Sequence, residues 1–179
     1  MKKIIYLLFA VLLITGCDNI SNTPTKQVEA FLNKYQTLDL EVIEDLDGVI
    51  DEHPNFSGEN REKYREIIKK QYKNLVYQVK EEKVNADVAT VVVEITVLDF
   101  SKVLAEASIA KENSPQIFLD SSGQYDEQKY YAYVISKMEQ SNEKVKYTLE
   151  IPLSKINDKW KIGELDSDTE DKILGVYEY

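Results

Sequence analysis

The sequence predicts an α+β domain, in which an antiparallel four-stranded sheet packs with helices on one face. Three observations lead to this prediction. Apolar residues recur at helical spacing between residues 24 and 75, and alternate with polar residues in two later segments, 76–100 and 145–162. Turn residues divide each alternating segment into a pair of strands. Layering the helices on the sheet would bury all of these apolar stripes.

Two helices with a bend between them are predicted over 24–50. Thr23 is a suitable N-cap, and Pro24 fits the first helical position, where its missing N–H is not needed. A bend is expected near Asp39, and a second apolar pattern follows it. The first helix carries one apolar stripe, formed by Val28, Phe31, Leu32, Tyr35 and Leu38.

A loop and a third helix come next. The loop is predicted over 53–58, where Pro54 and Gly58 interrupt the helical pattern. The helix is predicted over 59–75, with apolar residues on one side and lysines and arginines on the other.

The first hairpin is predicted from strands over 76–84 and 88–100. Asn85, Ala86 and Asp87 suit the turn between them. One face of the second strand is apolar and the other is mostly polar, which is typical of a half-buried strand. The apolar face consists of Val91, Val93, Ile95 and Val97.

Two more helices are predicted between the hairpins. Ser101 can cap a helix that runs to Lys111, and Pro115 separates it from a second helix over 125–140. The second helix carries four tyrosines: Tyr125, Tyr130, Tyr131 and Tyr133. Tyr130 and Tyr131 are expected to face the core and Tyr133 another side; the alternative is that the tyrosines border a pocket or a partner surface.

The second hairpin is predicted from a long strand over 145–153 and a short returning strand at 160–162. Asn157-Asp158 suits a type I′ turn, because both residues tolerate positive φ. Pro152 has no N–H to donate, so its strand is expected at an edge or bulged there. A short helix is predicted over 167–174.

This pattern resembles the nuclear-transport-factor-two-like, cystatin-like cone folds of many small bacterial lipoproteins. The resemblance rests on the Thr23-Pro24 helix with Phe31 and Tyr35, the sheet-forming middle, and the hairpin at 157–162, and on no signature motif. It implies a pocket enclosed by the curved sheet and its helices. Over part of 101–140 the family has strands, whereas the periodicity here predicts helices.

The N-terminal segment resembles a bacterial lipoprotein signal peptide with its lipobox. Lys2 and Lys3 precede an apolar run over 4–14, and Thr15-Gly16-Cys17 follows. The run is shorter than the about 20 residues of a membrane-spanning helix. The resemblance implies cleavage before Cys17 and a diacylglyceryl thioether on its Sγ. The alternatives are an ordinary signal peptide with an incidental cysteine, or an uncleaved membrane anchor.

Under this interpretation the chain has three parts: a signal peptide over 1–16, a lipidated tether over 17–25, and a single α+β domain over 26–179. The lipid on Cys17, such as palmitate-containing diacylglycerol, is expected to hold the protein on the extracytoplasmic face of the cell membrane. Two acyl chains are enough for stable anchoring. Cys17 is the only cysteine, so no disulfide is expected.

The charge balance argues against nucleic acid as a partner. The chain has 22 basic and 32 acidic residues, a net charge of −10. Removal of Lys2 and Lys3 with the signal peptide would leave 20 basic and 32 acidic residues, a net charge of −12. A strongly acidic chain repels nucleic acid phosphates and anionic lipid, so the anchor rather than the surface is expected to hold the protein at the membrane.

No catalytic, cofactor-binding or metal-ligating residue is predicted. His53 is the only histidine and is expected to be a solvated loop residue. One histidine and one lipidated cysteine leave only carboxylates for zinc, and carboxylates prefer harder ions.

Two acidic clusters are expected to be helix ends or solvated surface. The run Asp166, Asp168, Glu170 and Asp171 has the spacing of the first calcium-loop positions but lacks the required glycine and closing glutamate, so Asp166 or Ser167 is expected to cap the last helix. The second cluster is Glu44, Asp45, Asp47, Asp51 and Glu52.

These observations favour a non-catalytic binding or interaction module, for a small ligand or another envelope protein. One alternative is a pocket enzyme that uses carboxylates or tyrosines; another is a structural spacer. A deep pocket with converging ionisable groups would favour the enzyme, whereas a shallow or wholly apolar cavity would argue against it.

Overall fold

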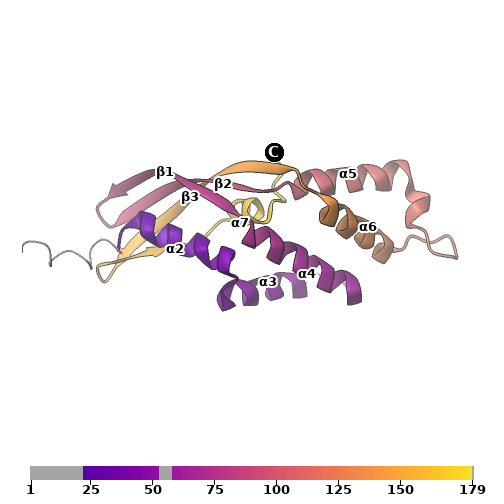
Figure 1. Ribbon diagram of the computed structural model, residues 1–179, viewed down its shortest axis with the longest axis horizontal. Helices are drawn as coiled ribbons and strands as arrows, with labels where there is room; N and C mark the ends of the chain where they lie inside the picture. Colours follow the sequence, from indigo (N-terminus) through magenta and orange to yellow (C-terminus); the bar gives the residue numbers. More distant parts are fainter. Residues whose placement is uncertain (1–21, 53–57, 179) are drawn as a thin grey trace, which may run out of the picture.

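Six α-helices and one four-stranded antiparallel sheet form the part of the chain that the computed structural model describes, residues 22–52 and 58–178 (Figure 1). The strand order is β1-β2-β3-β4, and each strand pairs with its sequence neighbour. The helices that pack on the sheet lie on one of its faces. The predicted α+β class, with a curved antiparallel sheet and helices on one face, is thereby confirmed.

The first helices form as the apolar spacing predicts. Helix α2 (Pro24–Thr37) begins at Thr23, whose Oγ1 accepts a hydrogen bond from Lys26 N at 3.2 Å. It ends at Leu38, where a left-handed backbone conformation with φ 53° produces the expected bend. Helix α3 (Leu40–Glu52) follows directly.

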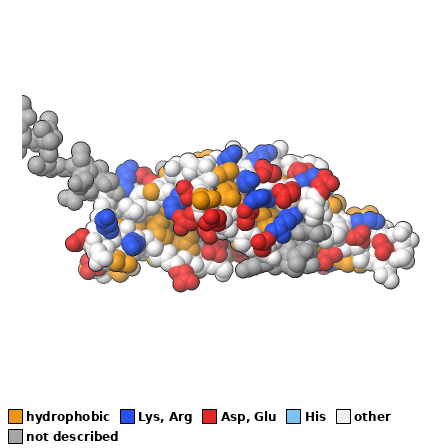
Figure 2. Space-filling model, turned by 90° about the horizontal axis from the view of Figure 1, so that it is seen from below, with side chains coloured by type: hydrophobic (Ala, Val, Ile, Leu, Met, Phe, Trp, Pro, Cys, Tyr) orange, Lys and Arg blue, Asp and Glu red, His pale blue; other side chains and the backbone are white. Residues whose placement is uncertain are grey.

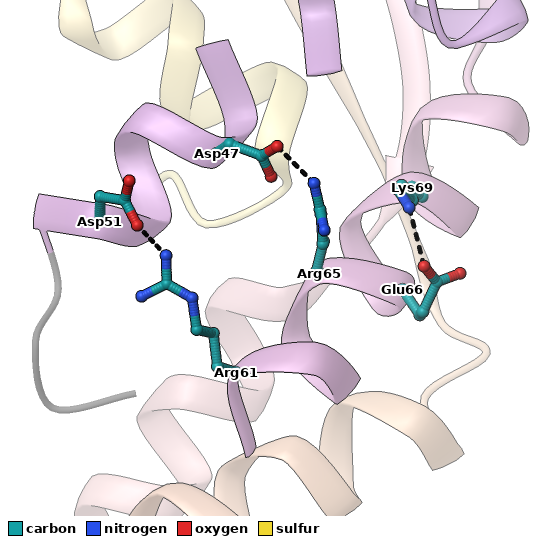
Figure 3. A network of polar contacts seen from close by, with 6 residues as sticks. All are labelled: Asp47, Asp51, Arg61, Arg65, Glu66 and Lys69. Atoms are coloured by element: carbon teal, nitrogen blue, oxygen red, sulfur yellow. Dashed lines mark hydrogen bonds and ion pairs between the residues drawn. The ribbon is translucent and has the colours of Figure 1, made fainter. Parts of the chain in front are cut away.

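Helix α4 (Gly58–Lys73) runs alongside α3. Residues 53–57 of the predicted loop lie outside the described residues. Two ion pairs connect the helices: Arg61 with Asp51, and Arg65 with Asp47 (Figure 3). Both arginines and both aspartates are four residues apart, so each pair of side chains lies on one face of its helix.

The sheet consists of β1 (Val76–Asn85), β2 (Val88–Leu98), β3 (Lys144–Ile156) and β4 (Lys159–Ile162). In β2, odd-numbered residues are buried and even-numbered ones half-buried, except for exposed Val88. The buried face meets α2 and α7, and its strands supply much of the core: Ala89, Val91, Val93, Ile95, Val97, Tyr147, Leu149, Ile151 and Leu153. None of the helices in the described part of the chain lies over the opposite face (Figure 1).

A helical hairpin separates β2 from β3. It consists of α5 (Phe100–Asn113), the 3-10 turn η1 (Pro115–Phe118) and α6 (Glu127–Gln140). This hairpin extends beyond one end of the sheet, while α2 begins at the other end (Figure 1). The segment is therefore helical, as the periodicity predicts, and lacks the longer strands that the family resemblance implies.

The predicted cap of α5 is wrong by two residues. Asp99, not Ser101, is the N-cap, and its carboxylate accepts from Lys102 N at 3.1 Å. Ser101 Oγ instead donates to the same carboxylate at 2.7 Å. The carboxylate is thereby held over the helix N-terminus, where negative charge is favourable.

The second hairpin confirms both of its local predictions. Asn157 and Asp158 have φ values of 51° and 61°, as a type I′ turn requires. β4 pairs only with residues 153–156 of β3, so β3 is an edge strand before that point. Pro152 lies at this boundary: its carbonyl accepts from Gly163 N at 2.8 Å, and the N–H that it lacks would face the same side.

Helix α7 (Ser167–Leu174) closes the fold next to the sheet and α4. Asp166 is its N-cap and accepts from Thr169 N at 2.8 Å, as predicted. The helix ends at Gly175, whose left-handed backbone (φ 77°) turns the chain toward the junction of β2 and α5.

Candidate functional site

A groove with an apolar floor lies between α4 and α6, next to the junction of β2 and α5. Its volume is about 490 Å³. The floor is formed by Ile67, Leu98, Phe100 and Met138, which come from four different elements. Since Phe100 and Met138 are almost fully buried, packing fixes the floor rather than loop conformation. We call this cavity the α4–α6 groove.

Charged side chains surround this floor at the solvent-exposed rim. The rim residues are Glu59, Glu62, Lys63, Glu66 and Lys70 from α4, and Glu139 and Ser141 at the end of α6. The rim therefore has four carboxylates and two ammonium groups. Figure 2 shows the same mixture more widely: on the face it draws, acidic and basic side chains are interspersed with small apolar areas.

Two of the four rim carboxylates, Glu59 and Glu66, form ion pairs with neighbouring lysines. Glu59 and Lys63 form an ion pair at 2.7 Å, which lowers the pKa of Glu59 and raises that of Lys63. Glu66 pairs with Lys69 at 2.8 Å, which lowers the pKa of Glu66 (Figure 3). These pairs favour the charged forms of Glu59, Lys63 and Glu66. The groove thus combines an apolar floor with ion pairs at its edge.

A second, smaller cavity lies among α2, α3, α4 and α7. Its volume is about 150 Å³, enough for a benzene-sized group or a few waters. Tyr35, Tyr64 and Tyr72 line it together with the carboxylates Asp45 and Glu170. The rings of Tyr35 and Tyr72 pack edge to face, with centroids 4.9 Å apart. No strand residue lines this cavity, so it is not the sheet-enclosed pocket that the family resemblance implies.

Burial keeps these tyrosines protonated. Desolvation, with smaller effects from nearby carboxylates, raises the pKa of Tyr35 to about 12 and raises the pKa of Tyr72 further. Desolvation also raises the pKa of Tyr64. A phenol with a raised pKa is a poor base or nucleophile at neutral pH, because it stays in its neutral form.

The tyrosine cavity makes stability depend on alkaline pH. Because tyrosine titrates near pH 10 in the unfolded chain and Tyr35 near 12 in the folded one, its contribution is complete below about pH 10 and lost as pH rises to about 12. We expect the urea midpoint to fall across this window, and to fall less steeply in Tyr35→Phe. Equal slopes for the two proteins would contradict this assignment.

The two acidic clusters have structural roles in the described part of the chain. Asp47 and Asp51 pair with the two arginines of α4, and Asp166 caps α7. Asp171 is partly buried, and desolvation followed by repulsion from Asp168 raises its pKa. Within residues 22–52 and 58–178, no three His, Cys, Asp or Glu side chains are grouped closely enough to hold a metal ion.

The tyrosines near α6 differ from the prediction in one respect. Tyr130 and Tyr133 pack against the core and stack edge to face on buried Phe118, whereas Tyr131 is not among the core contacts. Tyr133, not Tyr131, is therefore the second core-facing ring. Tyr125 precedes the helix and is exposed beneath Lys111 Nζ, which lies 4.7 Å from its ring centroid.

The predicted lipidation site Cys17, the single histidine His53 and the predicted signal peptide over 1–16 lie outside the described residues. Among the residues described, no helix has the length and apolarity needed to cross a bilayer. The α4–α6 groove could not be found from the sequence, because its floor residues come from four separate elements whose packing against one another periodicity does not predict.

The described residues form an α+β domain that has an apolar-floored groove of about 490 Å³ between α4 and α6. Comparisons with protein families, with curated proteins and with solved structures found no match for this chain.

Proposed function

We propose that this protein is a lipid-anchored binding module on the extracytoplasmic face of the cell membrane, and that it holds a small amphipathic ligand in the α4–α6 groove. The observation that carries the proposal is the groove itself. Its volume of about 490 Å³ lies in the range of small-molecule sites, and its apolar floor lies within a charged rim. Such a site suits a ligand with an apolar body and a polar or charged end.

Binding is favoured over catalysis by the placement of the ionisable groups. In the groove they lie at the exposed rim, where Glu59 and Glu66 already pair with lysines. In the smaller cavity the tyrosines are held neutral by burial. Catalysis by a carboxylate or tyrosine needs a group that converges on substrate with a matched pKa.

The anchor is supported by the N-terminal sequence, in which Lys2 and Lys3, the apolar run and Thr15-Gly16-Cys17 match a lipobox signal. We predict that Cys17→Ser releases the protein from the membrane fraction or leaves it as an unprocessed precursor. Cell fractionation with intact-mass analysis separates these results from the wild type, which should carry a diacylglyceryl group. A mutant that is processed normally and still cofractionates with membranes would contradict lipid anchoring.

The ligand site can be tested by photo-crosslinking in intact cells. We expect p-benzoylphenylalanine at Ser141, on the groove rim, to capture a small molecule, which intact-mass analysis would detect as a discrete adduct. The same residue at Ser136, which is exposed on α6 outside the groove, is the matched control. A protein adduct at Ser141 would favour an envelope protein as partner instead, and identical results at both positions would contradict the groove as the site.

A further inference from the structure

The sheet face that none of the described helices covers has a net charge opposite in sign to that of the whole chain. Even-numbered residues of β2 point to this face, so the strand registers place their partners there as well. The charged residues on this face are six lysines and three glutamates: Lys80, Lys83, Lys144, Lys146, Lys159, Lys161, Glu81, Glu94 and Glu150. We call this surface the lysine face. The net charge of these nine residues is +3. The net charge of the whole chain is −10, so all other residues together carry −13.

The lysines on this face are only partly neutralised by its own glutamates. Glu94 lies between Lys146 at 3.0 Å and Lys80 at 3.4 Å, and Lys83 pairs with Glu81 at 3.0 Å. The other three lysines, Lys144, Lys159 and Lys161, are exposed and form no ion pair with the described residues. Their ammonium groups are therefore available to an external anion.

The chain enters the domain beside this face. Asn22 Oδ1 accepts from Trp160 N at 3.1 Å, and its Nδ2 donates to Asp158 O at 2.7 Å, so the start of the domain is fastened to β4. Lys159 and Lys161 flank Trp160 on that strand. Cys17 is five residues before Asn22, and an extended chain spans at most about 3.6 Å per residue, so an acylated Cys17 keeps β4 within roughly 18 Å of the bilayer.

We propose that the lysine face docks on the anionic lipid headgroups of the membrane that anchors the protein. The proposal rests on the anchor put forward above, which keeps the face within reach of the leaflet. Ammonium groups attract phosphate-bearing headgroups over about one Debye length, roughly 8 Å at physiological salt, so the face must lie nearly flat on the surface to be effective. The acidic remainder of the domain would then point away from the membrane, which avoids repulsion.

The test uses the lipidated protein in vesicles of phosphatidylcholine, with or without phosphatidylglycerol. Ser154→Cys places a dye on the lysine face; the thiol of Cys17 is blocked by lipid, so the label is unique. Energy transfer to a headgroup acceptor should rise at least twofold with phosphatidylglycerol and return to the neutral-vesicle value at high salt. Equal transfer in both kinds of vesicle would overturn the proposal.

Charge-reversal variants identify the face responsible. Changing Lys144, Lys159 and Lys161 to Glu should abolish the gain in transfer. The same change at Lys26, Lys73 and Lys111, exposed lysines of α2, α4 and α5, alters the net charge equally and should leave the gain intact. Equal loss in both triple variants would overturn the proposal, because net charge alone would then explain it. Binding to soluble polyphosphate without approach to vesicles would also overturn it, in favour of an anionic polymer.

Failure of the anchor gives a different result. If the protein purified from cells carries no lipid on Cys17, it will not be retained on phosphatidylcholine vesicles. That result would refute the anchor. Flotation of that chain with phosphatidylglycerol vesicles would still decide the role of the lysine face. Salt-sensitive flotation that the lysine-face variant loses would support the face, and flotation indifferent to the variant would refute it.

Discussion

Replacing Gly175 with alanine is expected to lower the free energy of unfolding by about 3 kcal/mol or more, a large effect for one methyl group. Gly175 has φ 77°, a conformation that other residues adopt only with strain. A Cβ there would lie 2.2 Å from Leu98 O and 2.5 Å from Gln71 Nε2, so the backbone or the buried amide must move.

The movement would affect the start of the helical hairpin. The Gly175 carbonyl accepts from Phe100 N at 2.8 Å and Ser101 N at 2.9 Å, two of the N–H groups that α5 leaves without helical partners. A shift of Gly175 would therefore weaken α5 as well as the end of α7. We expect the loss to appear in global stability, because both helices contribute to the core through Phe100 and Ile173.

Gly123→Ala is the matched control. Gly123 has a similar φ of 80°, but a Cβ there would meet no atom within 4 Å. Gly123→Ala should lower the free energy of unfolding by about 1 kcal/mol, from backbone strain alone. Urea unfolding can be followed by fluorescence of Trp160, the only tryptophan and largely buried. Equal losses in the two variants would show that the contacts of Gly175 contribute nothing.

The secondary structure was largely predictable because local rules determine it. The alternation over 145–153 and the Asn157-Asp158 turn gave the second hairpin, and the Thr23-Pro24 start gave α2. The cap of α5 was misassigned because Asp99 and Ser101 are both good caps by residue type, and only the fold decides between them. The packing partner of each helix, and with it the α4–α6 groove, depends on long-range contacts that periodicity does not encode.

Net charge was the least informative prediction about surfaces. The value of −10 suggested a protein that anionic surfaces repel throughout. The alternation that buries one side of β2 and β3 leaves the lysines of the lysine face together on the other side of the sheet. Strands distant in sequence, such as β1 and β3, then bring Lys80 and Lys146 to the same glutamate. Total composition does not contain this information; strand register does.

A buried amide holds together the region around Gly175. Gln71 on α4 is only 1% exposed. Its Nε2 donates to Leu98 O and to Leu174 O, both at 3.0 Å, and its Oε1 accepts from Leu98 N at 2.9 Å. One side chain thus satisfies backbone groups at the ends of β2 and α7, where neither strand nor helix bonding continues. In the sequence, Gln71 is one polar residue between apolar helix positions, and its role could not be predicted.

Gln71→Leu keeps the approximate volume of the side chain but leaves one N–H and two carbonyls without this partner. Since an unsatisfied buried group costs about 1–3 kcal/mol, we expect a loss of about 3–5 kcal/mol in the free energy of unfolding, measured in urea by Trp160 fluorescence. Gln36→Leu is the control. Gln36 Nε2 makes one part-buried hydrogen bond, to Leu75 O at 2.7 Å, so this substitution should lower the free energy of unfolding by only about 1 kcal/mol.

When Gln71→Leu is combined with Gly175→Ala, the effects on the free energy of unfolding should be less than additive, since both changes disrupt the contact between Gln71 and Leu98. Full additivity would mean that the two residues act independently, and a loss no larger than that of Gln36→Leu would contradict the structural role assigned to Gln71.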